Sequence, residues 1–200
     1  MISNIEDLIS FTNNLEIILP QLKGKIALNY SGCPKEEIDK IKNAFPKMPK
    51  TYLDFVKQID LVGKSIGYFQ LAPNSEKGET LYEKLNNCNI HSAFKEVFQM
   101  NEVYQIGSWE ADPICIVYKS NQLVNGQIVK LNSEIKNQKP DILANSFVDY
   151  LLIVGNLELI KWDTKFSENS NKKVKEFKSI VARFALDLGP WLNLSNVLID

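Results

Sequence analysis

Three neighbouring residues, Trp109, Glu110 and Asp112, have the side chains best suited to catalysis or to binding a partner. Two carboxylates that flank a bond can hydrolyse a glycoside, and an indole beside them can stack on the sugar. On a strand, residues two apart share a face, so the spacing is compatible with a hydrolytic pair. Against this, Asp112-Pro113 is a common turn sequence, and Trp109 could cover a sheet edge. Because aromatic residues ringed by charge are typical of protein interfaces, we favour a binding role over catalysis.

The other reactive residues do not form a catalytic or metal-binding pattern. His91 is the single histidine, and its sequence context predicts the start of a short helix instead of a general base. One histidine and three scattered cysteines do not supply the usual zinc ligand sets. The chain contains neither of the glycine-rich phosphate-binding motifs, G-x-x-x-x-G-K and G-x-G-x-x-G. We therefore expect no catalytic residues, no metal and no cofactor.

Composition and charge indicate a soluble globular protein of 200 residues with a net charge of −1. Arg183 is the only arginine, and neither half of the chain is strongly basic or acidic, so we expect no binding to nucleic acid or to a membrane surface. The odd number of cysteines (Cys33, Cys88 and Cys115) predicts reduced thiols. With no signal-peptide pattern and no long apolar run, these features predict a cytoplasmic location.

The first hundred residues are predicted to be mainly helical. Ser3 and Glu6 have the spacing of a capping box, which predicts a first helix that ends before Pro20. A weak alternation over residues 26–30 predicts a strand. Pro34 opens a helix that Pro46 stops, and Pro49 opens another with its apolar stripe at Tyr52, Phe55, Val56 and Ile59. Residues 66–69 indicate a strand, 73–78 a polar loop, and 79–85 and 92–98 short helical turns.

The second hundred residues change to a period of two. Strands are predicted at 103–106, 114–118 and 127–131, with a turn at Asn125-Gly126, and the short connections favour antiparallel pairing. A helix from Ile142 is expected to stop at Gly155, followed by a strand over 157–162, a loop over 163–171 and a final helix that Gly189-Pro190 closes. This order predicts a single α+β domain, an antiparallel sheet flanked by N-terminal and C-terminal helices.

Three stretches, read together, resemble the SUKH superfamily of yeast cell-wall-synthesis regulators and bacterial toxin-immunity proteins. They are Gly32-Cys33-Pro34 with the segment through Phe55, the segment Ile106–Ile116, and the segment Ala144–Leu151. The chain departs from the family pattern at three places. Met48 stands where the family usually has leucine, and residues 60–63 replace the asparagine-glycine usual after the second helix. The turn at 110–113 lacks its usual glycine. The resemblance implies an N-terminal helix and lead-in over 1–31, a SUKH-like core over 32–156, and an extension over 157–200 whose long helix packs on the same domain.

The resemblance also implies a non-enzymatic binding protein whose cognate partner is a bacterial toxin, which it neutralises by occlusion. The candidate contact residues are Tyr68, Tyr104, Trp109, Glu110 and Asp112. Two alternatives remain open. One is a regulatory or scaffold module of the cell-wall-regulator kind, which binds several partners weakly. The other is a carbohydrate-active hydrolase that uses Glu110 and Asp112.

Overall fold

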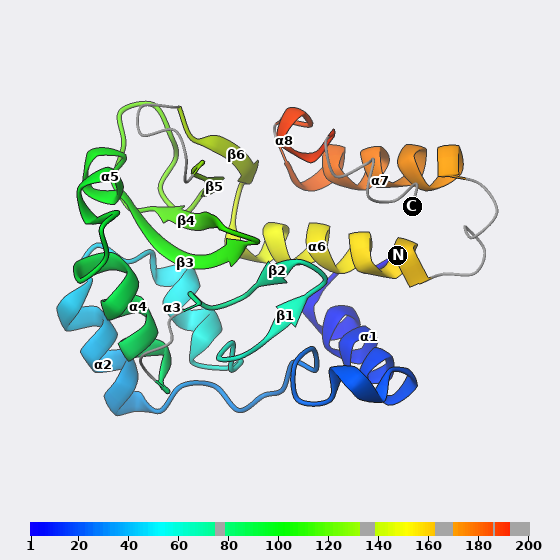
Figure 1. Cartoon of the computed structure of the whole chain (residues 1–200), viewed down its shortest axis with the longest axis horizontal. Helices are drawn as coiled ribbons and strands as arrows, with labels where there is room; N and C mark the ends of the chain where they lie inside the picture. The colour runs from blue at the N-terminus through cyan, green and yellow to red at the C-terminus, as the bar shows by residue number, and fades with distance from the viewer. Residues whose placement is uncertain (75–78, 133–138, 163–169, 186, 193–200) are drawn as a thin grey trace.

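A six-stranded antiparallel sheet runs through the middle of the described part of the chain (Figure 1). The structure is a computed structural model that describes residues 1–74, 79–132, 139–162, 170–185 and 187–192. The strands lie side by side in the order of the sequence, which confirms the antiparallel pairing expected from short connections. They are β1 (Ser65–Ile66), β2 (Phe69–Gln70), β3 (Val103–Trp109), β4 (Asp112–Val117), β5 (Ile128–Lys130) and β6 (Asp141–Ala144).

Helices precede, interrupt and follow this sheet, so the predicted α+β class is confirmed. Two helical groups matter for the surfaces discussed below: α2 with α4 and α5 near one end of β3, and α1, α6 and α7 near the other (Figure 1). The helices are α1 (Ile5–Ile18), the 3-10 helix η1 (Pro20–Leu22), α2 (Lys35–Ala44), α3 (Lys50–Val56), α4 (Leu81–Ile90), α5 (Lys95–Met100), α6 (Phe147–Trp162), α7 (Ser170–Phe184) and α8 (Gly189–Leu192).

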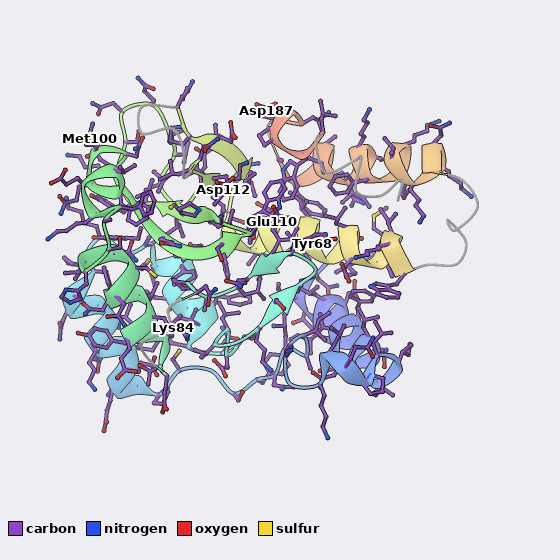
Figure 2. All side chains as sticks on the ribbon, viewed as in Figure 1. Tyr68, Lys84, Met100, Glu110, Asp112 and Asp187 are labelled. Carbon is purple, nitrogen blue, oxygen red and sulfur yellow. The ribbon has the colours of Figure 1, made fainter. Side chains whose placement is uncertain are left out.

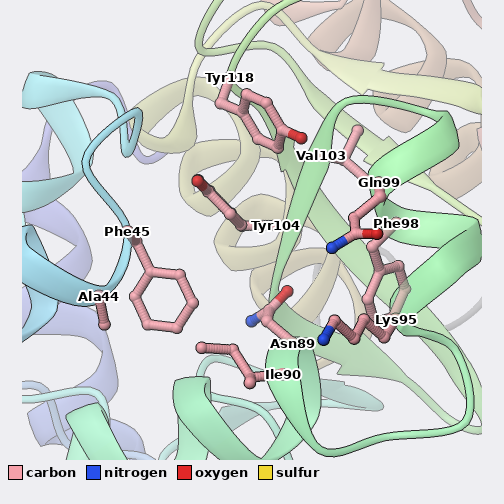
Figure 3. A pocket seen from close by; sticks show the side chains of 10 residues that line it. All are labelled: Ala44, Phe45, Asn89, Ile90, Lys95, Phe98, Gln99, Val103, Tyr104 and Tyr118. Carbon is pink, nitrogen blue, oxygen red and sulfur yellow. The ribbon is translucent and has the colours of Figure 1, made fainter.

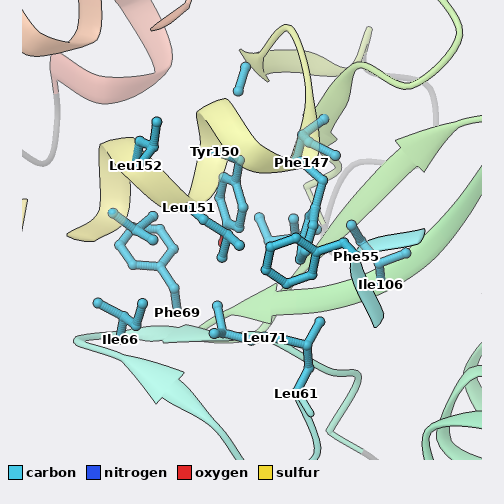
Figure 4. Packing of buried hydrophobic residues seen from close by; sticks show 14 of the residues in the cluster. Phe55, Leu61, Ile66, Phe69, Leu71, Ile106, Phe147, Tyr150, Leu151 and Leu152 are labelled. Atoms are coloured by element: carbon cyan, nitrogen blue, oxygen red, sulfur yellow. The ribbon is translucent and has the colours of Figure 1, made fainter. Parts of the chain in front are cut away.

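Both faces of the sheet are buried, and the side chains of β4 point alternately to one face and to the other. Ile114 and Ile116 point into the main core, whereas Cys115 and Val117 point to the opposite face. The main core includes the aromatic and aliphatic side chains of α3, α6 and the β1–β2 hairpin (Figure 4). Phe98 of α5 packs on the opposite face and closes the smaller cluster. Successive residues of β4 therefore belong to two different apolar clusters.

Helix α6 is the central helix, and three predictions about it are wrong. It begins at Phe147 and not at Ile142, which lies in the strand β6. Gly155 does not end it, and residues 157–162 continue the helix in place of the predicted strand. A Cβ atom on Gly155 would lie 2.4 Å from Leu8 Cδ1, so the glycine permits α1 to pack closely against α6. Helix α7 lies alongside α6 on the side away from α1 (Figure 1). The boundary at 156/157 falls inside α6, and the division into three segments stays a prediction.

Several other predicted elements differ from those in the structure. Asn4, not Ser3, is the N-cap of α1, because Asn4 Oδ1 accepts the Asp7 N–H at 2.8 Å. Residues 26–30 form no strand, although Ile26 and Leu28 are buried. The predicted strand over residues 66–69 is a hairpin of two short strands. His91 ends α4 instead of starting a helix.

The C-terminal region also differs from the expectation. The final long helix, α7, ends at Phe184, and Gly189-Pro190 begins α8 instead of closing α7. The predicted polar loops fall partly on residues 75–78 and 163–169, which lie outside the described residues. Trp191 of α8 is fully buried and its Nε1–H donates to the Leu143 carbonyl at 2.9 Å. This contact fixes α8 against β6.

Candidate functional site: an exposed aromatic patch

Tyr68 lies in the two-residue turn between β1 and β2, where 48% of its surface is exposed. Gly67 precedes it with a φ of +57° and permits the close approach of Glu158, since a Cβ there would lie 2.7 Å from Glu158 Oε2. The hairpin therefore rests on α6, with the Tyr68 ring at the surface. Figure 2 shows Tyr68 beside α6, close to Glu110.

The end of α6 supplies the neighbours of Tyr68. Lys161 Nζ lies 5.3 Å from the centre of the Tyr68 ring and 5.9 Å from the centre of the Trp162 ring, so one cation lies over two aromatic faces. Trp162 is 45% exposed, and its Nε1–H donates to Glu158 Oε1 at 2.6 Å. The buried Glu158 thus orients the Trp162 indole while leaving much of its ring in solvent.

Glu110 completes this surface. It occupies the tight turn between β3 and β4 with a φ of +53°, and its backbone N–H donates to the Tyr68 carbonyl at 3.4 Å. The two hairpin turns are therefore joined, which brings an exposed carboxylate next to the aromatic residues. We call Tyr68, Glu110, Lys161 and Trp162 the aromatic patch.

Trp109 and Asp112 form a separate cluster behind the patch. They are cross-strand partners at the ends of β3 and β4, and Lys130 of β5 contacts both. Lys130 Nζ lies 4.8 Å from the centre of the Trp109 ring and 3.2 Å from Asp112 Oδ2. Trp109 ends β3, is half-buried, and stacks on Trp191 at 6.1 Å between ring centres.

Glu110 and Asp112 do not share a strand face. Glu110 is in the turn, whereas Asp112 is the first residue of β4 and binds Lys130. The spacing that suggested a hydrolytic pair therefore corresponds to a turn residue followed by a strand residue. This geometry does not favour the hydrolase interpretation.

Tyr104 is near the opposite end of β3 from Trp109, a separation of roughly 17 Å at the usual rise per residue. Its ring lies 4.3 Å from that of Tyr118 and 5.2 Å from that of Phe45. Burial raises the pKa of Tyr104, and the nearby Tyr118 raises it further. The five predicted contact residues are thus divided among three places.

Sequence reasoning missed Lys161 and Trp162 because it assigned residues 157–162 to a strand. A usable signal was present: Glu158 and Trp162 are four residues apart, a spacing that brings two side chains together on a helix. The prediction of Tyr68 depended on its residue type alone. The two-residue turn that exposes its ring was not predicted.

Comparisons with known proteins return no match: no family model, curated protein or solved structure is similar to this chain. Within the described residues, no three histidine, cysteine or acidic side chains gather as a metal-ion site would require. Among the described helices, none combines the length and apolar character needed to cross a membrane.

Proposed function

We propose that this chain is an immunity-type protein that binds a cognate bacterial toxin and neutralises it by occlusion. The observation that carries the binding role is the aromatic patch, in which Tyr68 and Trp162 are each almost half exposed and lie on either side of Lys161. Exposed aromatic side chains with fixed orientation are the residues that most often dominate binding energy at interfaces.

The patch is supported by rigid elements, which favours tight docking. The Glu158 carboxylate holds Trp162, and the backbone bond from Glu110 to Tyr68 joins the two hairpin turns. Side chains that are already ordered lose little conformational freedom on binding, so more of the contact energy appears as affinity. The toxin as partner comes from the resemblance of residues 32–152 to the SUKH superfamily.

The test is co-expression with the toxin encoded beside this chain, followed by measurement of the dissociation constant of the purified pair. The double variant Tyr68→Ala/Trp162→Ala should weaken binding by at least about a hundredfold, as expected for two central aromatic anchors. Protection of the host cells should fall in parallel. Val124→Ala is the matched control, because Val124 is another exposed apolar residue, in the loop before β5.

Two outcomes contradict the proposal. If the wild-type chain forms no complex and cell death is unchanged, the chain is not the antidote of that toxin. If the complex forms but the double variant binds as well as the Val124→Ala control, the aromatic patch is not the docking surface. Recovery of several unrelated partners and no toxin would instead favour the scaffold alternative.

A further inference from the structure

A hollow of about 270 Å³ lies at the Tyr104 end of β3, away from the aromatic patch (Figure 3). Its volume is near the lower end of the range for small-molecule sites, so it suits a ligand with one ring. Helices α4 and α5, the end of α2 and the strand β3 surround it. The lining residues are Ala44, Phe45, Asn89, Ile90, Lys95, Phe98, Gln99, Val103, Tyr104 and Tyr118.

The base of this hollow is fixed by Asn89. Its side-chain amide donates to the carbonyls of Leu85 and Gln105, both at 2.9 Å, and its Oδ1 accepts the Gln105 N–H at 2.6 Å. These three bonds hold α4 against β3. The base of the cavity is therefore built by contacts between α4 and β3.

The walls of the hollow are aromatic. Phe45 and Phe98 lie on either side of it, and Tyr104 and Tyr118 stack on each other at one edge. A planar ring placed here would meet aromatic side chains on more than one side, an arrangement that stabilises aromatic pairs beyond the burial of surface. The shape and lining therefore favour a flat, apolar ligand body.

The polar groups that face the hollow include one cation, Lys95, and one amide, Gln99, that can donate hydrogen bonds. The Lys95 amine and the Gln99 amide reach from α5 toward Asn89 and Tyr104 (Figure 3), and neither has a hydrogen-bond or ion-pair partner within the described residues. Lys47 Nζ lies over the Tyr118 ring at 5.2 Å. The nearby acidic residue Glu102 pairs with Lys119 at 3.9 Å. This arrangement selects an anionic end on the ligand.

We propose that this hollow binds a small aromatic carboxylate, with its ring against Tyr104 and Phe98 and its carboxylate at Lys95 and Gln99. A carboxylate has two oxygens in one plane, which matches one ammonium and one amide donor. The site is independent of the aromatic patch and of any toxin. A negative result for ligand binding in this hollow would therefore leave the proposed toxin binding untouched, and the reverse also holds.

The test is an NMR titration of the isolated chain with phenylacetate, followed through the side-chain amide signals of Asn89 and Gln99. Phenylacetate should give saturable shifts confined to the hollow, and the neutral isostere phenylacetamide should bind at least about tenfold more weakly, as expected from loss of a charged hydrogen bond. Inorganic phosphate tests for unspecific anion binding and should give no saturable shift of these signals.

Three variants complete the test. Lys95→Met should weaken phenylacetate at least about tenfold, and Gln99→Glu should abolish its binding by placing a like charge at the carboxylate. Both residues are exposed, so thermal unfolding should confirm that the variants fold. Lys35→Met, an exposed lysine at the start of α2, should leave the affinity unchanged. The proposal is overturned if phenylacetate does not saturate, if phosphate or the amide binds equally well, or if Lys95→Met has no effect.

Discussion

Asn89 and Asn156 each use one side-chain amide to satisfy both backbone groups of a distant residue. Asn89 accepts from the N–H and donates to the carbonyl of Gln105, on the edge of β3 that faces away from β4 and that β2 does not reach. Asn156 on α6 makes the same pair of bonds with Ile2, each at 2.8 Å. In both places a primary amide satisfies backbone groups that no helix or strand pairs, which matters because a buried unpaired backbone group is costly.

Asn156→Ala should destabilise the protein by about 2–4 kcal/mol, because it leaves the buried N–H and carbonyl of Ile2 without partners. Hydrogen exchange should become faster at Ile2 and through the first turns of α1, since the chain start is then held only by apolar contacts. Chemical denaturation and exchange mass spectrometry measure the two effects. Asn14→Ala, at an exposed position on α1, is the control. Equal exchange at Ile2 in both variants would contradict the argument.

Tyr52 and Tyr150 have buried hydroxyl groups with no hydrogen-bond partner within the described residues. Both rings pack against Phe147 in the main core, and Figure 4 shows Tyr150 beside Phe147. Replacing either by phenylalanine keeps the ring and removes the cost of burying an unpaired hydroxyl. We therefore expect Tyr52→Phe and Tyr150→Phe to raise the free energy of unfolding by about 1 kcal/mol, opposite to the usual effect of this change.

Tyr104→Phe is the matched control for these two substitutions. The Tyr104 hydroxyl interacts with the Lys47 backbone, so its removal should lower the free energy of unfolding by about 1 kcal/mol. Urea denaturation of the three variants gives the comparison. A loss of stability in both core variants would mean that a water molecule or another group satisfies the two buried hydroxyls.

At the scale of elements, the sequence predicts structure best where a local pattern of residue types decides the element. The strands β3, β4 and β5 and the helix α2 follow from local alternation, proline positions and the Asn125-Gly126 turn, where Gly126 has a φ of +91°. Helix α6 is different, because it is buried around most of its circumference and gives no amphipathic signal. The glycine near its centre is explained by the close approach of Leu8 and Ile2, contacts that no local pattern contains.

The candidate site was predicted only in part, because its geometry also depends on contacts between residues far apart in the sequence. Tyr68 and Glu110 were predicted from residue type alone, without the tight turns that hold them at the surface. The burial of Trp109 depends on Trp191, which comes from a helix far along the chain, and the sequence offered no sign of that contact. Trp162 joined the patch only because α6 continues past Gly155. Long-range packing therefore decided which aromatic residues remain exposed.

The segment before α2 is attached to the end of α3 by a glycine that has no room for a side chain. A Cβ on Gly32 would lie 2.2 Å from the Lys57 carbonyl carbon and 2.5 Å from the Gln58 nitrogen, and both are backbone atoms. The adjacent Cys33 N–H donates to the Val56 carbonyl at 2.8 Å. Close packing of the two backbones thus connects two elements of the core.

Gly32→Ala should consequently lower the free energy of unfolding by about 2–3 kcal/mol, since backbone atoms must separate to admit the methyl group. Ser31→Ala, at the exposed neighbouring position, should change it by less than about 0.5 kcal/mol. Urea denaturation provides both values. If the two variants were equally stable, the two backbones would have to be less tightly packed than the distances indicate.

At the scale of the whole molecule, Trp191 links the C-terminal helices to the sheet. Its ring lies between 6.0 and 6.5 Å from those of Phe69, Trp109 and Tyr150, which come from two strands and α6. Asn156 ties the N-terminus to the same helix. Because both ends of the described chain pack on α6, one core includes residues from all three segments into which the resemblance divides the chain.

This shared core also determines how stability depends on pH. Burial raises the pKa of Cys115 well above its ordinary value of 9.0, and burial with the negative charges of Glu37 and Asp60 raises that of Cys33 to about 12. Burial likewise raises the pKa of Cys88. Above pH 9 the unfolded thiols lose protons that the folded thiols keep, so the unfolded state binds fewer protons and stability falls as pH rises.

The free energy of unfolding should therefore decline from about pH 9 upward, with the fully buried Cys115 contributing a slope of at most about 1.4 kcal/mol per pH unit. The half-buried Cys33 contributes less than its shift suggests, because water screens it. Cys115→Ala should reduce the slope. Val117→Ala removes a non-titrating side chain from the same small cluster, so it should lower stability at every pH without changing the slope. Urea denaturation at intervals from pH 7 to 11 measures the difference, and identical slopes in the two variants would show that Cys115 ionises as readily in the folded protein as in the unfolded chain.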